Sequence, residues 1–127
     1  MKIKLPKSKS LKKQNDELWS ECIKARAKYK SELSGKTDRL HSHHIAGKDC
    51  YRLRWELENG ICLTAGEHFY GVHHQSRKQE YENKIKALRG DNIFERLELL
   101  RQYKVKVNLQ LTKIYLEQKL KEFRDKL

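Results

Sequence analysis

The sequence is a short and strongly basic chain. It has 127 residues and a formal net charge of +12, from 29 Lys and Arg against 17 Asp and Glu. This length allows one small domain with a modest core, and the positive field favours a polyanion, above all DNA, as partner. No apolar run approaches the ~18 residues of a membrane span, and no signal-peptide core follows the basic N-terminus. We expect a soluble, cytoplasmic protein that binds no membrane.

The composition predicts helices and reduced thiols. Three cysteines, Cys22, Cys50 and Cys62, are odd in number and form no Cys-x-x-Cys pair, which argues against a disulfide framework and a thiolate zinc site. One proline and six glycines are too few turn formers for a β-sandwich, whereas Lys, Glu, Leu and Arg favour helices. The predicted class is α+β, mostly α.

The N-terminal third is predicted to be an arm and a helix. Residues 1–14 are rich in lysine and have little to bury, which is typical of a loosely docked or disordered basic arm. From residue 15 or 16 to Tyr29, apolar side chains recur every three or four residues, with Trp19 on the flank, as in an amphipathic helix. Ser34 and Gly35 end this second segment, residues 15–35.

Residues 36–75 have a different character, because helical periodicity is lost and all six histidines lie here. Residues 40–45 and 60–63 are predicted to be short strands, and residues 51–57 between them an extended stretch. Asn59 and Gly60 are expected to make the turn before the second strand, since both accept the positive φ of a reversal.

The C-terminal extension, residues 76–127, is predicted to be helical. Ser76 and Asp91 can cap helices that end at residues 88 and 103, and Gly90 separates them. Alternating apolar residues from 103 to 111 also fit a strand, but a lone strand would have no partner, so we expect a linker at 105–107 and a final helix from Asn108. The apolar seam of that helix can pack on the domain or on a second copy, as a homodimer.

A histidine pair, His43 and His44, ends the first predicted strand. Neutral imidazoles bind metals and titrate near neutral pH. Because adjacent side chains of a strand point to opposite faces, one of the two is expected to bind a metal and the other to act as a base.

The segment 40–74, with this pair, an Asn-Gly turn and a following histidine, resembles the HNH or ββα-metal nuclease motif. Its stretch RWELENGICL is similar to phage HNH proteins, and the helical tail to the phage recombination nucleases called Rap or NinG. The resemblance implies a ββα-metal core in residues 36–75 and a metal-dependent endonuclease that hydrolyses DNA phosphodiester bonds. A phage origin would place it in the host cytosol, acting on recombination or replication intermediates.

Residue by residue, the resemblance makes His43 and His68 ligands of one divalent ion, Mg²⁺ or Mn²⁺ or another. It makes His44 the general base, and Asn59 the residue that fixes the loop orienting His44. His73 lies five residues after His68, about 140° round an ideal helix, and joins the metal only if the helix is distorted or ends near Gly71.

One feature of the HNH pattern is missing. Many relatives hold a structural zinc with two Cys-x-x-Cys pairs, but Thr64 and Glu67 stand at the later pair, so no structural zinc is expected. Packing by Trp55, Ile61 and Leu63 is expected to support the core instead.

Three further residues are candidates for nucleic-acid binding: Arg52, Arg54 and His41. Two other functions stay open on the sequence. One is a non-catalytic basic DNA-binding accessory protein that keeps a degenerate HNH fold. The other is a structural zinc protein using His43, His68 and either His73 or His74.

Overall fold

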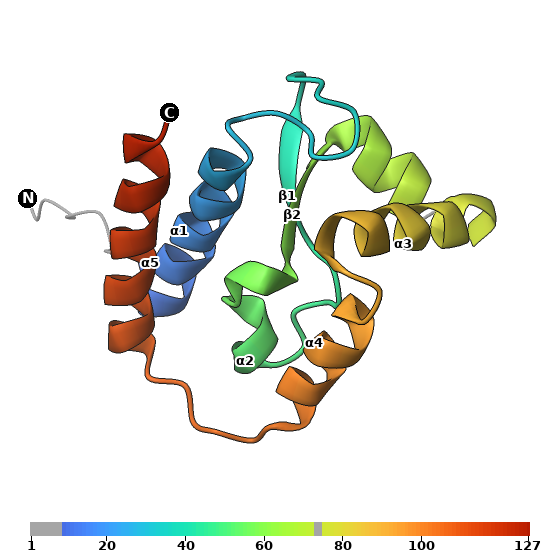
Figure 1. Ribbon diagram of the computed structural model, residues 1–127. Coiled ribbons are helices and arrows are strands. Elements are labelled where there is room, and N and C mark those ends of the chain that lie inside the picture. Colours follow the sequence, from blue (N-terminus) through green and yellow to red (C-terminus); the bar gives the residue numbers. More distant parts are fainter. Residues whose placement is uncertain (1–8, 73–74) are drawn as a thin grey trace, which may run out of the picture.

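The computed structural model describes residues 9–72 and 75–127 (Figure 1). Its elements are α1 (Leu11–Arg26), β1 (Leu40–His44), α2 (Tyr51–Arg54), the 3-10 turn η1 (Leu57–Asn59), β2 (Gly60–Thr64), the π-helix η2 (Glu67–Val72), α3 (Gln75–Arg89), α4 (Ile93–Gln102) and α5 (Leu109–Asp125). The predicted class is confirmed, because the described residues are mostly helical with one two-stranded sheet. None of their helices has the length and apolar character needed to cross a membrane.

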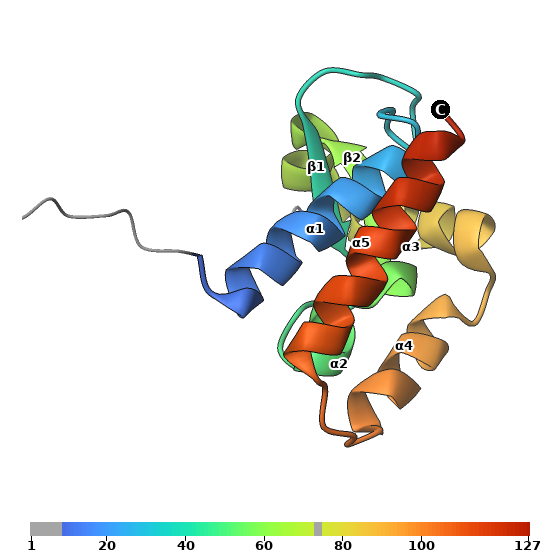
Figure 2. The same cartoon turned by 90° about the vertical axis from the view of Figure 1, so that its left-hand side faces the viewer.

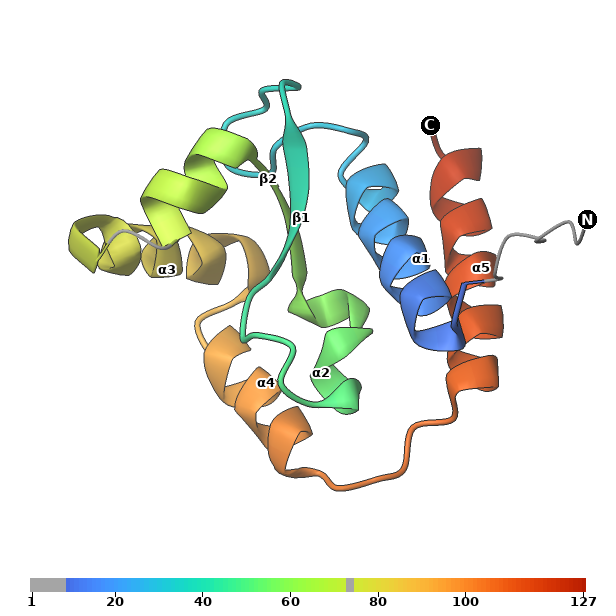
Figure 3. The same cartoon turned by 180° about the vertical axis from the view of Figure 1, so that it is seen from behind.

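The sheet separates two layers of helices. β1 and β2 are antiparallel, with His43 opposite Ile61 and His44 opposite Gly60, so the two predicted strands are confirmed. Directly opposed residues share one face of a sheet. Figures 1 and 3 show α1 and α5 on one side of the strands, and α3 and α4 on the other.

Each layer has its own apolar core. The cluster toward α1 and α5 contains Trp19, Cys22, Ile23, Ala25, Trp55, Leu57, Cys62, Leu116 and Leu120. The cluster toward α3 and α4 contains Leu53, Ile61, Leu63, Ile85, Ile93 and Leu97. The support expected from Trp55, Ile61 and Leu63 is therefore present, and the seam of α5 packs within the domain. Homodimerisation stays a prediction.

The first and last helices lie side by side and run in the same direction (Figure 2). The amide of Asn15 donates to the carbonyl of Leu109 at 3.0 Å, and Cys22 Sγ donates to that of Leu116 at 3.3 Å. The irregular linker 103–108 makes this parallel arrangement possible, because it carries the chain back to the start of α1 before α5 begins. Asn108 caps α5 as predicted, its Oδ1 accepting from the amide of Leu111 at 2.9 Å.

The boundaries of the first helix differ from the prediction. α1 begins at Leu11, not at residue 15 or 16, because the hydroxyl of Ser10 accepts from the amide of Lys13 and caps it. It ends at Arg26, since Lys28 and Tyr29 have φ values of 56° and 55°, outside the helical region. Of the predicted arm, residues 1–8 lie outside the described residues.

Two predictions about residues 51–60 are wrong. Residues 51–57 are not extended, because α2 and η1 place Leu53 in one apolar cluster and Trp55 in the other. Gly60 has a negative φ of −115° and begins β2. A glycine is needed there for space: a Cβ atom would lie 2.2 Å from Ile23 Cδ1 and 2.9 Å from the Trp19 ring.

Candidate metal and catalytic site

Three histidines from two elements meet on the α3 side of the sheet. His43 Nδ1 lies 3.1 Å from His68 Nε2, so β1 and η2 bring together the two residues expected to share a metal. The other nitrogen of His68, Nδ1, lies 3.3 Å from His41 Nδ1. His41 and His43 are two residues apart on β1, and this spacing puts both on one face.

The distance between His43 and His68 suits a shared cation. Two imidazole nitrogens bound to one ion at about 2.0–2.1 Å are separated by roughly 3.0–3.4 Å, the range that contains this contact. A hydrogen bond between neutral rings has a similar length. Within residues 9–72 and 75–127, no group of three or more His, Cys, Asp or Glu side chains is arranged to hold a metal. Water or phosphate oxygens would complete the coordination of an ion held by this pair.

The prediction that His73 is a third ligand lies outside the described residues, as does the alternative His74. The segment just before them does depart from an α-helix. Glu67–Val72 forms a π-helix, whose hydrogen bonds join residues five apart, and such turns are frequent at functional sites. The distortion near Gly71 that a His73 ligand requires is therefore present in the backbone up to Val72.

His44 lies on the opposite face of the sheet from His43. Its ring stacks on Trp19 of α1, with the ring centroids 3.8 Å apart and the planes 5° from parallel. His44 Nε2 is 2.8 Å from the carbonyl oxygen of Arg54. Since a carbonyl only accepts, Nε2 carries the hydrogen and the lone pair of the neutral ring is on Nδ1. The opposite orientation of His43 and His44 is therefore confirmed, and their roles stay predictions.

Burial lowers the pKa of His44, and its bond to the Arg54 carbonyl opposes this shift only in part. The imidazole is therefore neutral at pH 7, with an available lone pair. A fixed tautomer and a neutral ring are what a general base needs before it takes a proton.

Asn59 holds the loop that follows His44. Its side-chain oxygen accepts from the amide of Ala46 at 2.8 Å, and its side-chain NH₂ donates to the carbonyls of Gly47 at 2.8 Å and Leu53 at 3.0 Å. Asn59 is fully buried, so these bonds replace water completely. The amide ties residues 46–47 to α2, the helix whose last residue, Arg54, fixes the ring of His44.

A capping box that the sequence analysis missed starts the helical segment carrying His68. The hydroxyl of Thr64 accepts from the amide of Glu67 at 3.2 Å, and Glu67 Oε1 accepts from the amide of Thr64 at 2.8 Å. Glu67 Oε1 also accepts from the Ser31 hydroxyl at 2.6 Å. The signal was visible as Thr-x-x-Glu. Thr64 and Glu67 occupy the positions of the later cysteine pair in the HNH pattern, and here they hold the turn by hydrogen bonds.

Arg54 is engaged inside the protein. Its Nε and NH2 donate to the two carboxylate oxygens of Asp16 at 2.8 and 2.6 Å, and Trp55 Nε1 donates to Asp16 Oδ1 at 2.9 Å. Asp16 thereby joins α1 to α2, and a DNA contact by Arg54 would have to compete with this pair. Arg52, by contrast, is exposed. The predicted contacts of Arg52, Arg54 and His41 with nucleic acid stay predictions.

We expect Asp16→Asn to lower the free energy of unfolding more at pH 7 than at pH 3. Burial raises the pKa of Asp16, yet the bonds from Arg54 and Trp55 outweigh it and leave the pKa below its usual value. The stabilisation is therefore full above the unfolded pKa of about 3.9 and is lost as pH falls through the folded value. Urea unfolding at both pH values measures this.

The control for this variant is Glu17→Gln, which removes an exposed ion pair with Lys9. Exposed pairs contribute little, so its stability should stay near that of the wild type at both pH values. An equal loss for Asp16→Asn at pH 7 and pH 3 would contradict the assignment.

In the described residues, His43 therefore lies beside His68, and His44 lies on the other face of the sheet with its hydrogen on Nε2. Asn59 holds the loop that follows His44. The chain matches no protein-family model, and comparisons with curated proteins and with solved structures give no match either.

Proposed function

We propose that this protein is a metal-dependent endonuclease of the HNH type that hydrolyses DNA phosphodiester bonds. The contact that carries the proposal is the 3.1 Å approach of His43 Nδ1 and His68 Nε2, from elements separated by the whole β1–β2 connection. The net charge of +12 supports a polyanionic substrate. Phage recombination or replication intermediates are the substrates that the sequence resemblance implies.

The proposed division of labour follows the two faces of the sheet. His43 and His68 would hold one divalent ion, and such an ion stabilises charge on the phosphate and the leaving oxygen. His44 would take a proton from water at Nδ1, since Nε2 is committed to the Arg54 carbonyl. Because its ring lies on the opposite face from His43, that water and the ion would have to meet at the end of β1, of which His44 is the last residue. Asn59 and Asp16 would keep α2, and so that carbonyl, in place.

A second candidate function is a non-catalytic DNA-binding accessory protein. The observation that favours it is the close stacking of His44 on Trp19, a contact also typical of a histidine that serves only as part of the core. In that case the basic surface would bind DNA, and the histidine pair would be a remnant.

Plasmid nicking separates the two candidates and gives a direct prediction. We expect cleavage in the presence of divalent metal, none in excess EDTA, and recovery when metal is added back. Because imidazole binds first-row transition ions more tightly than Mg²⁺, Mn²⁺ and Ni²⁺ should restore cleavage at lower concentrations than Mg²⁺. His68→Ala should abolish the recovery at those lower concentrations.

The matched control is His41→Ala, which removes the exposed imidazole 3.3 Å from His68 Nδ1 and leaves both proposed ligands, His43 and His68, in the chain. It should retain metal-dependent cleavage. Full activity in EDTA would contradict the metal mechanism. No nicking with any of the three ions, together with intact DNA binding, would favour the accessory protein.

A further inference from the structure

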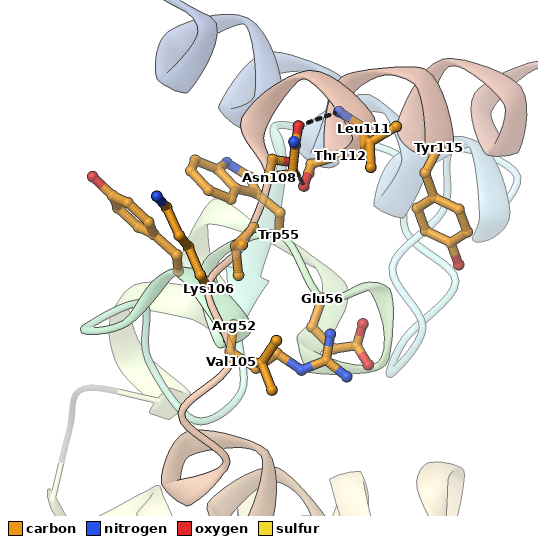
Figure 4. Close-up of a pocket in the computed structure, with 11 residues that line it drawn as sticks. Arg52, Trp55, Glu56, Val105, Lys106, Asn108, Leu111, Thr112 and Tyr115 are labelled. Carbon is orange, nitrogen blue, oxygen red and sulfur yellow. Dashed lines mark hydrogen bonds between the residues drawn. The ribbon is translucent and has the colours of Figure 1, made fainter.

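A groove that the proposed chemistry does not use lies between α2, the linker 103–108 and the first turns of α5 (Figure 4). It consists of two adjoining cavities of about 380 and 770 Å³, which share Tyr51, Arg52 and residues 105–108 of their lining. Figure 4 shows side chains from α2, the linker and the first turns of α5 around the smaller of these cavities. Arg54, whose carbonyl fixes His44, belongs to the same short helix that forms one wall.

Three tyrosines present aromatic surface at this groove. Tyr51 is 39% exposed, Tyr103 63% and Tyr115 47%, although large aromatic side chains are usually covered in a domain with two cores. Tyr51 packs at 5.1 Å against Trp55, which keeps its ring in place, and Lys12 Nζ lies 5.1 Å above it. A ring that is both exposed and held in place can stack on a nucleic-acid base.

The charge of the lining is positive. Lys104 and Lys106 are exposed on the linker and form no ion pair with the described residues. The carboxylate among the described lining residues is Glu56, which Arg52 faces in Figure 4. The linker lysines therefore remain for an anionic ligand.

We propose that this groove binds an unpaired segment of DNA, with bases stacked on the tyrosines and phosphates near Lys104 and Lys106. The inference deepens the proposed nuclease function and rests on it for the choice of DNA. Duplex DNA hides its base faces, so exposed rings in a groove favour a single strand. A second copy of this chain would bring the same charge of +12, which disfavours a dimer contact here.

The test is binding of a fluorescent oligo-dT of about 15 nucleotides, within the usual site size of a single-strand groove. Anisotropy is measured in EDTA, so that binding is read without cleavage. Tyr51→Ala should weaken binding about tenfold, and Tyr51→Phe, which keeps the ring, should bind within about twofold of wild type. Lys106→Ala should reduce the slope of log affinity against log salt by about 0.7.

The control for charge is Lys121→Ala, an exposed lysine on α5 six residues beyond Tyr115, the last residue of the groove lining. Its salt slope should be nearer to that of wild type. Lys106 is exposed on an irregular linker, so Lys106→Ala should leave the fold intact. This variant therefore tests the groove even if Tyr51→Ala unfolds.

Wild-type binding by both Tyr51→Ala and Lys106→Ala would overturn the groove assignment. If the two variants lose as much affinity for a duplex of the same length, the preference for an unpaired strand is overturned. If wild type binds oligo-U more tightly than oligo-dT, and the variants lose the same affinity for it, the groove binds RNA instead of DNA. Since no cleavage is measured, failure of the nuclease proposal would appear separately, as absent nicking with groove binding intact.

Discussion

His44→Phe is expected to reduce DNA cleavage by about 10²- to 10⁴-fold, the usual contribution of a general base. Phenylalanine keeps an aromatic ring against Trp19 but has no nitrogen to accept a proton or to bond the Arg54 carbonyl. The fold and DNA binding should therefore survive while the chemical step is lost. Single-turnover cleavage with saturating Mn²⁺, beside anisotropy on the same duplex, measures both properties.

His41→Ala is the informative comparison for this variant. His41 is exposed and on the same face as His43, with Nδ1 3.3 Å from His68, so its ring could reach a water molecule at the metal pair. We expect a loss below about tenfold. The reverse result, an active His44→Phe and an inactive His41→Ala, would move the base to His41 and leave His44 as a packing residue.

Asn59→Ala is expected to cause the largest loss of stability among single polar substitutions at this site. The change removes one acceptor and two donors from a fully buried position, so Ala46 N–H and the Gly47 carbonyl lose their partner, while the Leu53 carbonyl keeps its bond from the Glu56 amide. A cost of about 2–4 kcal/mol follows, which lowers the melting temperature by roughly 10 °C. Thermal and urea unfolding provide the measurement.

Asn108→Ala is the matched control, since it removes the same side chain from the exposed N-cap of α5. Loss of a cap costs about 1 kcal/mol, clearly less than the buried substitution. If the folded fraction of Asn59→Ala is assayed at low temperature, cleavage should also be slowed, because loop 46–47 and α2 lose their shared anchor. Equal melting temperatures for the two variants would contradict the role of Asn59.

Part of the site could be predicted from local patterns. The two strands lie in the segment where helical periodicity is lost, and the opposite directions of His43 and His44 follow from the alternation of any strand. The cap at Asn108 and the break at Gly90 follow from side-chain and backbone chemistry alone. The resemblance then singled out His68, and η2 does bring it to His43.

The sequence did not reveal the helix at Tyr51–Arg54 or the reason for Gly60. YRLRWEL alternates like a strand, but Leu53 and Trp55 are buried in different clusters, and a short helix followed by a turn satisfies both. An Asn-Gly pair is typical of a turn, whereas Gly60 is needed because Ile23 and Trp19 of α1 leave no space for a Cβ atom. Both facts depend on segments more than 25 residues away in the chain, which local patterns do not contain.

Local patterns therefore account for the charge, the long helices, the two strands, and the presence of several imidazoles near one strand. What surrounds each histidine depends on packing between distant segments. α1 packs on one face of the sheet and places Trp19 under His44, while η2 and α3 cover the other and bring His68 to His43. The groove beside α2 forms because the linker 103–108 runs from the end of α4 to the start of α5, which packs on α1. The course of this linker is set by packing between segments that are distant in the sequence.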